Sequence, residues 1–183
     1  VKETLTGIYL QKGGMVAPSE LYSPSEANIE AAVARLSASY NNASDDRRFQ
    51  AIFIADSGRQ LKTIVAAFKK NNFDLSKVKL LGTGLWDDPD IAKIPEMSGA
   101  WFPSSPPNIY NEFENRFMAT YGYKPIRLAS LAYDAVHLIA QLSMPMADGS
   151  INAAALTDPN GYVSPANGLV RLKIDGTSER RLS

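Results

Sequence analysis

One continuous apolar run constrains this chain more than any other feature: residues 51–55, which read Ala-Ile-Phe-Ile-Ala. A run of this length and composition is typical of a parallel strand that is covered on both faces. Further strand-length segments lie at 77–81 and 99–102. Strands that alternate with helices of about 10–15 residues indicate βαβ units. We therefore predict an α/β fold in which helices flank a parallel sheet.

Two helices of this region are marked by apolar residues on one face. The first begins after Ser25, and the second follows the break Asp56-Ser57-Gly58, where Asp56 or Ser57 can act as the N-cap. Their apolar positions recur at the spacing of one buried helix face: Ile29, Ala32, Val33 and Leu36 in the first, and Leu61, Ile64, Val65 and Phe68 in the second.

The segment before the first of these helices has a different character. Gly13 and Gly14 end a short helix-like stretch, and residues 15–22 are predicted to form another strand. Pro18 lacks a backbone donor, so this strand is expected at an edge of the sheet or at a strand start.

The second part of the chain is mainly helical and ends in a hairpin. Helices are predicted at 108–121 and 126–143, and the latter carries a wide apolar stripe. Residues 169–174 alternate with period two, which predicts a half-exposed strand. The turn Asp175-Gly176 leads to a return strand at 180–182. We divide the chain into an α/β ligand-binding lobe at 1–105, a helical segment at 106–157 and a C-terminal strand and hairpin at 158–183.

Composition excludes several kinds of chemistry. The chain has 19 basic and 19 acidic residues, whereas a nucleic-acid surface usually shows a basic excess, so no nucleic-acid partner is expected. It has no cysteine, which excludes disulfides, thiolate nucleophiles and iron–sulfur clusters. Its single histidine, His137, excludes a histidine-rich metal site. No apolar run is long enough for a transmembrane helix.

Three acids near one another, Asp87, Asp88 and Asp90, could bind calcium or magnesium. The alternative is an N-cap at Asp88 with Pro89 at the first helical position, followed by an acid that complements the helix dipole. We favour capping, because the spaced ligands of a calcium loop are lacking.

Other candidate chemistry is equally weak. Ser57 lacks the Gly-x-Ser-x-Gly context of a nucleophile elbow. His137 lies between apolar neighbours, which is typical of a structural histidine. Gly82-Thr83-Gly84 follows a strand, but it lacks the remaining glycine of a dinucleotide fingerprint. We therefore predict no catalytic residue, no metal site, no cofactor and no enzymatic activity.

The positive signal comes from the positions at which strands end. In parallel α/β sheets, ligands bind beyond the carboxyl ends of the strands. These positions offer hydroxyls, an acid, free N–H groups at helix starts and an indole, which suit a small polar ligand. Ordinary capping loops are an equally weighted interpretation. The predicted ligand-binding residues are Tyr22, Ser23, Asp56, Ser57, Gly58, Gly84, Leu85 and Trp86.

The order of these segments resembles the carboxyl-terminal lobe of type I periplasmic binding proteins, the Leu/Ile/Val-binding family of ABC-transporter solute receptors. The resemblance runs from about Gly13 to Leu142. It rests on five stretches: residues 49–56, 78–83 and 99–102, the aromatic helix Phe113 to Pro125, and residues 131–136 with the motif Tyr-Asp-Ala. It implies two lobes around a cleft, a periplasmic location and a membrane permease as partner.

Three other stretches resemble the binding-protein-like domain of penicillin-binding-protein activator lipoproteins: residues 81–89, the late Asn167 to Leu172, and Asp175-Gly176 with Glu179-Arg180. That branch implies a cell-wall synthase as partner and a lipid anchor in the full-length protein. In amino-acid receptors of the wider family, the loop after the third strand often carries a carboxylate for the ligand's ammonium. This chain has Gly84, Leu85 and Trp86 there, which argues against a free amino acid.

The resemblance also implies that these 183 residues are about half of a two-lobed protein. In the family, the helices near 108–143 pack largely against the other lobe. We therefore expect the stripe on 126–143 and the ring face of Tyr110, Phe113 and Phe117 to be exposed. An exposed apolar patch of that size favours self-association, so we predict a homodimer or a domain-exchanged arrangement.

Overall fold

The computed structural model describes the chain except for residues 1, 18, 145–149, 181 and 183. It separates into two compact units, Val1–Phe102 and Pro103–Ser183, here called unit 1 and unit 2. The helical segment predicted at 106–157 and the hairpin segment at 158–183 both lie within unit 2.

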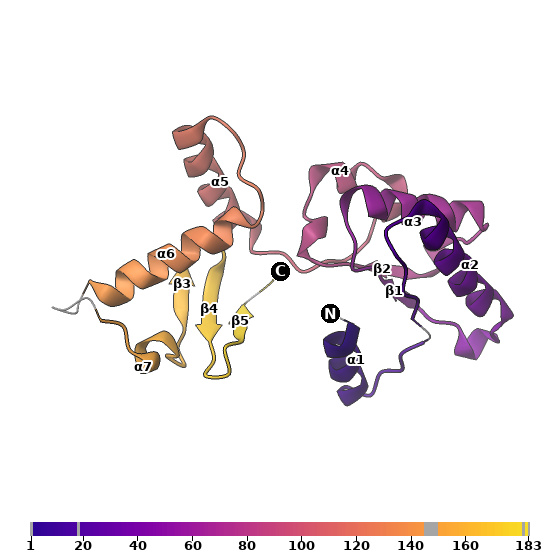
Figure 1. Cartoon of the computed structure of the whole chain (residues 1–183), viewed down its shortest axis with the longest axis horizontal. Coiled ribbons are helices and arrows are strands. Elements are labelled where there is room, and N and C mark those ends of the chain that lie inside the picture. The colour runs from indigo at the N-terminus through magenta and orange to yellow at the C-terminus, as the bar shows by residue number, and fades with distance from the viewer. Residues whose placement is uncertain (1, 18, 145–149, 181, 183) are drawn as a thin grey trace. The chain divides into compact units, whose positions relative to one another are not determined.

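Unit 1 is built on a small parallel sheet (Figure 1). Strand β1 (Ala51–Phe53) pairs with β2 (Lys79–Leu81), with Ile52 opposite Leu80. The helices are α1 (Lys2–Gln11), α2 (Glu26–Asn42), α3 (Gly58–Lys70) and α4 (Pro89–Ala92). Single 3-10 turns are η1 (Asp45–Arg47), η2 (Leu75–Lys77), η3 (Gly84–Trp86) and η4 (Pro95–Met97). The predicted α/β class and both parallel strands are confirmed. The first strand is not covered on both faces, however, since Ile52 and Ile54 are buried while Ala51 and Ala55 are exposed.

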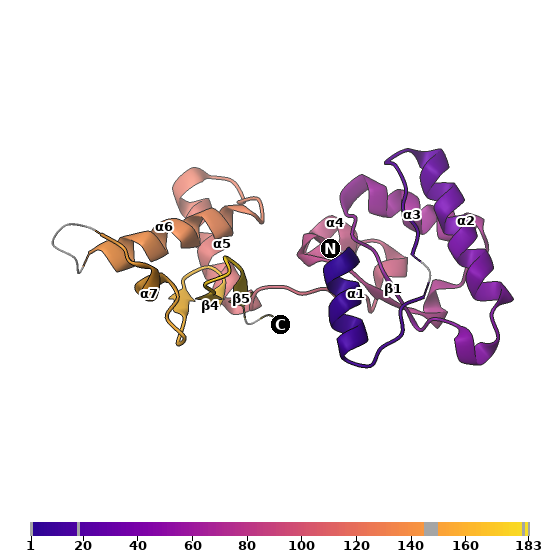
Figure 2. The same ribbon diagram turned by 60° about the horizontal axis from the view of Figure 1, so that its bottom comes forward.

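The core of unit 1 lies between this sheet and the helices. Helices α2 and α3 lie side by side in both views (Figure 2), and α3 buries the predicted face almost completely. Leu61 is fully buried and Phe68 is 2% exposed. Burial of a large apolar side chain contributes about 1.5–3 kcal/mol, so this face holds α3 on the sheet. The buried cluster further includes Ile29, Val33, Ile52, Ile54, Ile64, Val65, Phe73, Val78, Leu80, Trp86, Ile91 and Met97.

Two predicted strands differ from the structure. The segment at 99–102 is reduced to one parallel bridge between Leu81 and Trp101. The left-handed Gly99 (φ 78°) before it and Pro103 after it restrict its length. The prediction of a strand at 15–22 is wrong for the described residues of that segment, and Pro18 lies outside them. Side chains hold the segment instead of a strand ladder, since Glu20 accepts a 2.7 Å bond from Arg35 of α2.

Helix α1 confirms the helix-like stretch before Gly13 and Gly14. None of its residues is buried, and its apolar residues Leu5, Ile8, Tyr9 and Leu10 are exposed. An isolated helix of this length is marginal in water, so α1 contributes little to the stability of unit 1.

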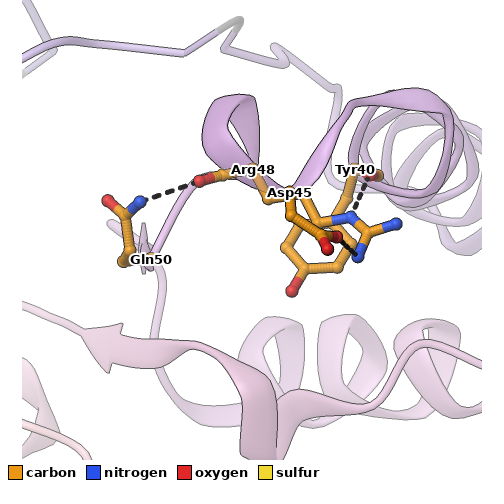
Figure 3. Close-up of polar contacts among 4 residues, drawn as sticks. All are labelled: Tyr40, Asp45, Arg48 and Gln50. Carbon is orange, nitrogen blue, oxygen red and sulfur yellow. Dashed lines mark hydrogen bonds and ion pairs between the residues drawn. The ribbon is translucent and has the colours of Figure 1, made fainter.

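Arg48 braces the connection between α2 and β1 (Figure 3). Its Nε donates to the carbonyl of Tyr40 in the last turn of α2, at 3.3 Å. Its guanidinium also lies 5.3 Å from the centre of the Tyr40 ring and pairs with Asp45. The amide of Gln50 donates to the Arg48 carbonyl at 3.0 Å, directly before β1. These contacts fix the direction in which β1 enters the sheet.

Unit 2 combines helices with an antiparallel sheet. Its helices are α5 (Pro107–Tyr121), α6 (Ala129–Ser143) and α7 (Ala153–Leu156). Its strands β3 (Tyr162–Ser164), β4 (Gly168–Leu172) and β5 (Ser178–Arg180) pair in that order. The predicted hairpin across Asp175-Gly176 is confirmed, with its return strand two residues earlier than predicted. Residue 181 of that prediction lies outside the described residues. Strand β3 has no counterpart in the sequence-based prediction.

Helix α6 presents apolar residues to solvent and buries polar ones. Ser130 and Asp134 are 1% and 5% exposed, on the face toward the turn between β3 and β4. By contrast, the predicted stripe residues Leu128, Leu131 and Ile139 are 60%, 40% and 54% exposed. The expectation of an exposed stripe on this helix is thus met for these residues.

The expectation of an exposed ring face on α5 is wrong. Phe113 is only 3% exposed, because the ring of Tyr133 from α6 covers it at a centroid distance of 5.1 Å. The Arg127 guanidinium lies 3.6 Å from the centre of the Tyr110 ring and covers that ring as well. Residues of unit 2 itself therefore cover the rings of Tyr110 and Phe113.

Candidate ligand-binding site

The predicted site residues gather where β1 and β2 end. The Ile54 N–H donates to Leu81 at 2.8 Å, and the Gly82 N–H donates to Trp101 at 2.9 Å. After these bonds, residues 55–58 and 83–86 continue the two strands beyond the carboxyl edge of the sheet. Because β1 and β2 are parallel, both segments leave the sheet at the same edge.

Trp86 supports this edge from beneath. Its ring is 2% exposed, and its indole N–H donates to the Asp56 carbonyl at 2.7 Å. The ring lies over Gly82 so closely that a Cβ there would fall 2.1 Å from a ring carbon. The indole predicted to face a ligand is therefore buried, and its donor is already used.

Asp56 links a second segment to the edge. Its carboxylate accepts a hydrogen bond from the hydroxyl of Tyr22, which precedes α2. Burial raises the pKa of the Tyr22 hydroxyl well above its ordinary value, and the bond to Asp56 and its negative charge raise it further. Asp56 therefore contacts Tyr22 through its side chain and Trp86 through its carbonyl. It joins three chain segments at the site.

Ser57 and Gly58 form the start of α3. Ser57 occupies the N-cap position, but its hydroxyl makes no capping hydrogen bond. Gly58 has a left-handed backbone, with φ 54°. The first N–H groups of a helix have no intrahelical acceptor, and the helix dipole places partial positive charge there. This is the part of the predicted set that offers unused donors.

The remaining predicted residues lie around this start. Ser23 is exposed, and its carbonyl accepts from the Ser25 N–H at 2.7 Å. Gly84 begins the turn η3, in which the Leu85 N–H donates to the Thr83 hydroxyl at 3.3 Å. The Leu85 side chain is 50% exposed and offers an apolar surface.

Of the acids that follow η3, Asp88 caps the next helix, as favoured from the sequence. The Asp88 carboxylate accepts from the Asp90 N–H at 2.8 Å, and Pro89 is the first residue of α4. Asp90 pairs with Lys93 at 2.8 Å, and this bond lowers the pKa of the Asp90 carboxyl. Among the described residues, no group of three or more acidic, histidine or cysteine side chains is arranged to hold a metal ion.

Two of the surface hollows of unit 1 lie away from the predicted site residues. One lies between α2 and α3, and its polar lining includes Glu30, Arg59 and Lys70. The other lies beside β2 and is lined in part by Phe73, Lys79 and Glu96.

His137 belongs to unit 2, where its Nδ1 makes a hydrogen bond with the Tyr162 hydroxyl. Its ring also stacks on that of Tyr133 at 6.3 Å. These contacts agree with the structural role expected for this histidine.

Unit 2 contains a buried polar network that was not predicted from the sequence. The Asp134 carboxylate accepts from the Asn167 side-chain amide and, at 3.2 Å, from the Ala166 N–H. The Asn167 carbonyl oxygen accepts from the hydroxyls of Ser105, at 2.6 Å, and Ser130, at 3.3 Å. Every polar group of this network has a partner, so the network fastens α6 to the β3–β4 turn. The only signal in the sequence was an acid within the apolar stripe of α6.

Comparisons with known proteins identify the family of this chain. A sequence profile of the periplasmic binding protein family matches residues 1–166. Searches of the curated proteins and of the solved structures returned no significant match. Among the residues that the structure describes, no helix combines the length and hydrophobicity needed to cross a bilayer. Since the profile covers most of the chain and agrees with the α/β architecture, the chain belongs to the type I periplasmic binding protein family.

Proposed function

We propose that this chain is a non-enzymatic binding lobe of a periplasmic solute receptor of the Leu/Ile/Val type, which serves an ABC-transporter permease. The observation that carries the proposal is the start of α3. There the uncapped Ser57 hydroxyl and the left-handed Gly58 follow directly on the end of β1. The family match supports a solute-binding fold with this edge facing a cleft.

The donors at this edge suit an anionic group on the ligand. Backbone N–H groups and the dipole at a helix start favour a carboxylate, and the Ser57 hydroxyl adds another donor. The Asp56 carboxylate accepts the Tyr22 hydroxyl through one of its oxygens. In amino-acid receptors of the family, the loop that here holds the half-exposed Leu85 often carries a carboxylate for the ligand's ammonium. We therefore propose a small ligand with a carboxylate and an apolar portion.

Calorimetry of the full-length protein with a panel of amino acids and small carboxylates tests this proposal. Replacing Ser57 by Ala removes one donor to a charged acceptor, worth about 1.5–3 kcal/mol, so the Kd should rise roughly tenfold to hundredfold. Ser39→Ala, on the exposed surface of α2, is the matched control and should leave the Kd unchanged. Silence across the panel, or equal effects of the two substitutions, would contradict a ligand at this edge.

A regulatory role is the second candidate, and the exposed side of α6 favours it. Leu128, Val136 and Ile139 offer an apolar surface that a protein partner could cover. We propose a cell-wall synthase as that partner, in a periplasmic, lipid-anchored protein that activates a penicillin-binding protein. Capture of a synthase by the full-length protein, abolished by Ile139→Glu and combined with silence in calorimetry, would favour this role over transport.

A further inference from the structure

Two Asn-Gly pairs occur in this chain, Asn160-Gly161 and Asn167-Gly168. Asn-Gly is the dipeptide in which the next backbone nitrogen reaches the side-chain amide with least steric hindrance. Asparagine is accordingly among the thermolabile residues of proteins. The structure places the two pairs in opposite environments, so they serve as each other's control.

We propose that Asn160 is a site of spontaneous deamidation and that the fold protects Asn167 from the same reaction. The Gly161 nitrogen attacks Cγ of Asn160 and gives up its proton to solvent, while the side-chain nitrogen leaves as ammonia. Water then opens the cyclic imide at either of its two carbonyls. The products are aspartate or isoaspartate at position 160, without any change of oxidation state.

The surroundings of Asn160 leave its side chain free to react. Asn160 is exposed, and no hydrogen bond of its side-chain amide occurs among the described residues. It lies in the β-turn 158–161, in which the Gly161 N–H donates to the Asp158 carbonyl at 2.9 Å. This bond closes a surface turn, and the opening of such a turn requires little free energy.

The fold also requires glycine at position 161, which preserves the reactive pair. Gly161 has φ 76°, a conformation that other residues rarely adopt. A Cβ there would lie 2.7 Å from both the Val170 carbonyl oxygen and a side-chain carbon of Arg171. Substitution at 161 would therefore be strained, and only a change at Asn160 can remove the pair without disturbing β3 and β4.

Asn167 is held at every polar atom of its side chain. It is 2% exposed, its carbonyl oxygen accepts from Ser105 and Ser130, and its amide donates to Asp134. Attack by the Gly168 nitrogen would require this buried network to open first. We expect deamidation of native Asn167 to be at least about a hundredfold slower than that of Asn160.

The reaction would change the turn that leads into β3. Aspartate at 160 places a second carboxylate beside Asp158, and isoaspartate lengthens the backbone between Asp158 and Gly161. The bond from Arg171 Nε to the Pro159 carbonyl, at 2.9 Å, spans this turn and would be disturbed by the longer backbone.

Peptide mapping by mass spectrometry tests the proposal on the full chain, incubated at mildly alkaline pH with and without denaturant. In the native protein, the peptide with Asn160 should gain the mass of an amide-to-acid conversion and react with an isoaspartyl methyltransferase. The peptide with Asn167 should do neither until denaturant is added. Asn160→Gln should abolish the change in the native protein.

Two results would overturn the proposal. One is a native rate at Asn160 no greater than that at Asn167. The other is an increase in the Asn160 rate on unfolding as large as the increase at Asn167, since the turn would then be protective too.

Discussion

Replacing Gly82 by Ala should destabilise unit 1 through a steric clash between the new Cβ and the Trp86 ring. The new Cβ would lie 2.1, 2.3 and 2.4 Å from three carbons of the Trp86 indole. Approaches under 3.0 Å are essentially never seen for a Cβ, so the ring must move. Trp86 is 2% exposed and fills the core, so no open space is available to receive it. Its displacement also removes the 2.7 Å bond to the Asp56 carbonyl.

The size of the effect follows from these two terms. Overpacking of a filled core costs about 1–3 kcal/mol. Leaving a buried acceptor without its donor costs about 1–3 kcal/mol more. We expect the free energy of unfolding to fall by about 2–4 kcal/mol in total, since relaxation of the loop relieves part of the strain. With a urea dependence of about 2 kcal/mol/M, the midpoint should drop by about 1–2 M.

Urea unfolding followed by tryptophan fluorescence measures this change. The chain has two tryptophans, so the experiment is done in a Trp101→Phe background, where Trp86 alone reports. Gly7→Ala in α1 is the matched control, because a Cβ there meets nothing within 4 Å. That control should leave the midpoint unchanged. A Gly82→Ala midpoint equal to that of its parent would refute the argument, because the ring would then not be fixed over Gly82.

Three further changes have equally definite expectations. Asp134→Ala leaves the buried amide of Asn167 without its acceptor. The free energy of unfolding of unit 2 should fall by about 2–4 kcal/mol. A calorimetric melting temperature within about 1 °C of the parent would contradict this. The pKa of the Tyr22 hydroxyl is higher in the folded than in the unfolded state, so the protonated hydroxyl stabilises the fold. This contribution is complete below the ordinary tyrosine pKa of about 10 and decreases as the pH rises above it. Tyr22→Phe should therefore reduce the fall of the unfolding midpoint above that pH. Ile139→Glu should abolish concentration-dependent self-association in light scattering, whereas Val163→Glu, at an exposed position of β3, should leave it unchanged. A parent protein that stays monomeric at high concentration would refute self-association through the exposed side of α6.

Much of unit 1 was predictable because its signals are local. The apolar run at β1 and the one-sided periodicity of α3 each favour burial, and Ile52 and Ile54 of the run share a buried cluster with the apolar face of α3. The cap at Asp88 was likewise predictable from its own carboxylate and Pro89. The strand expected at 15–22 failed because pairing depends on a neighbour, and side-chain bonds to Arg35 and Asp56 hold that segment instead.

The candidate site shows the same division. Sequence order alone placed Asp56 and Ser57 at the end of a strand, where parallel sheets bind ligands. It could not show that the Trp86 ring folds back over Gly82, nor that Tyr22 reaches Asp56 from a distant segment. In the same way, Asp134 looked like an isolated acid in an apolar stripe until Asn167 was brought against it.

Local sequence patterns were enough to predict the α/β class, the strands β1 and β2 and the start of α3, since periodicity and capping act over a few neighbouring residues. Which side chains at that edge have a hydrogen-bond partner follows from long-range packing. Whether a polar group is available depends on partners that are distant in the sequence, as Trp86 and Tyr22 are for Asp56. Each of these bonds engages a donor or an acceptor at the edge. Among the described residues there, the Ser57 hydroxyl makes no capping bond, and the first N–H groups of α3 have no intrahelical acceptor.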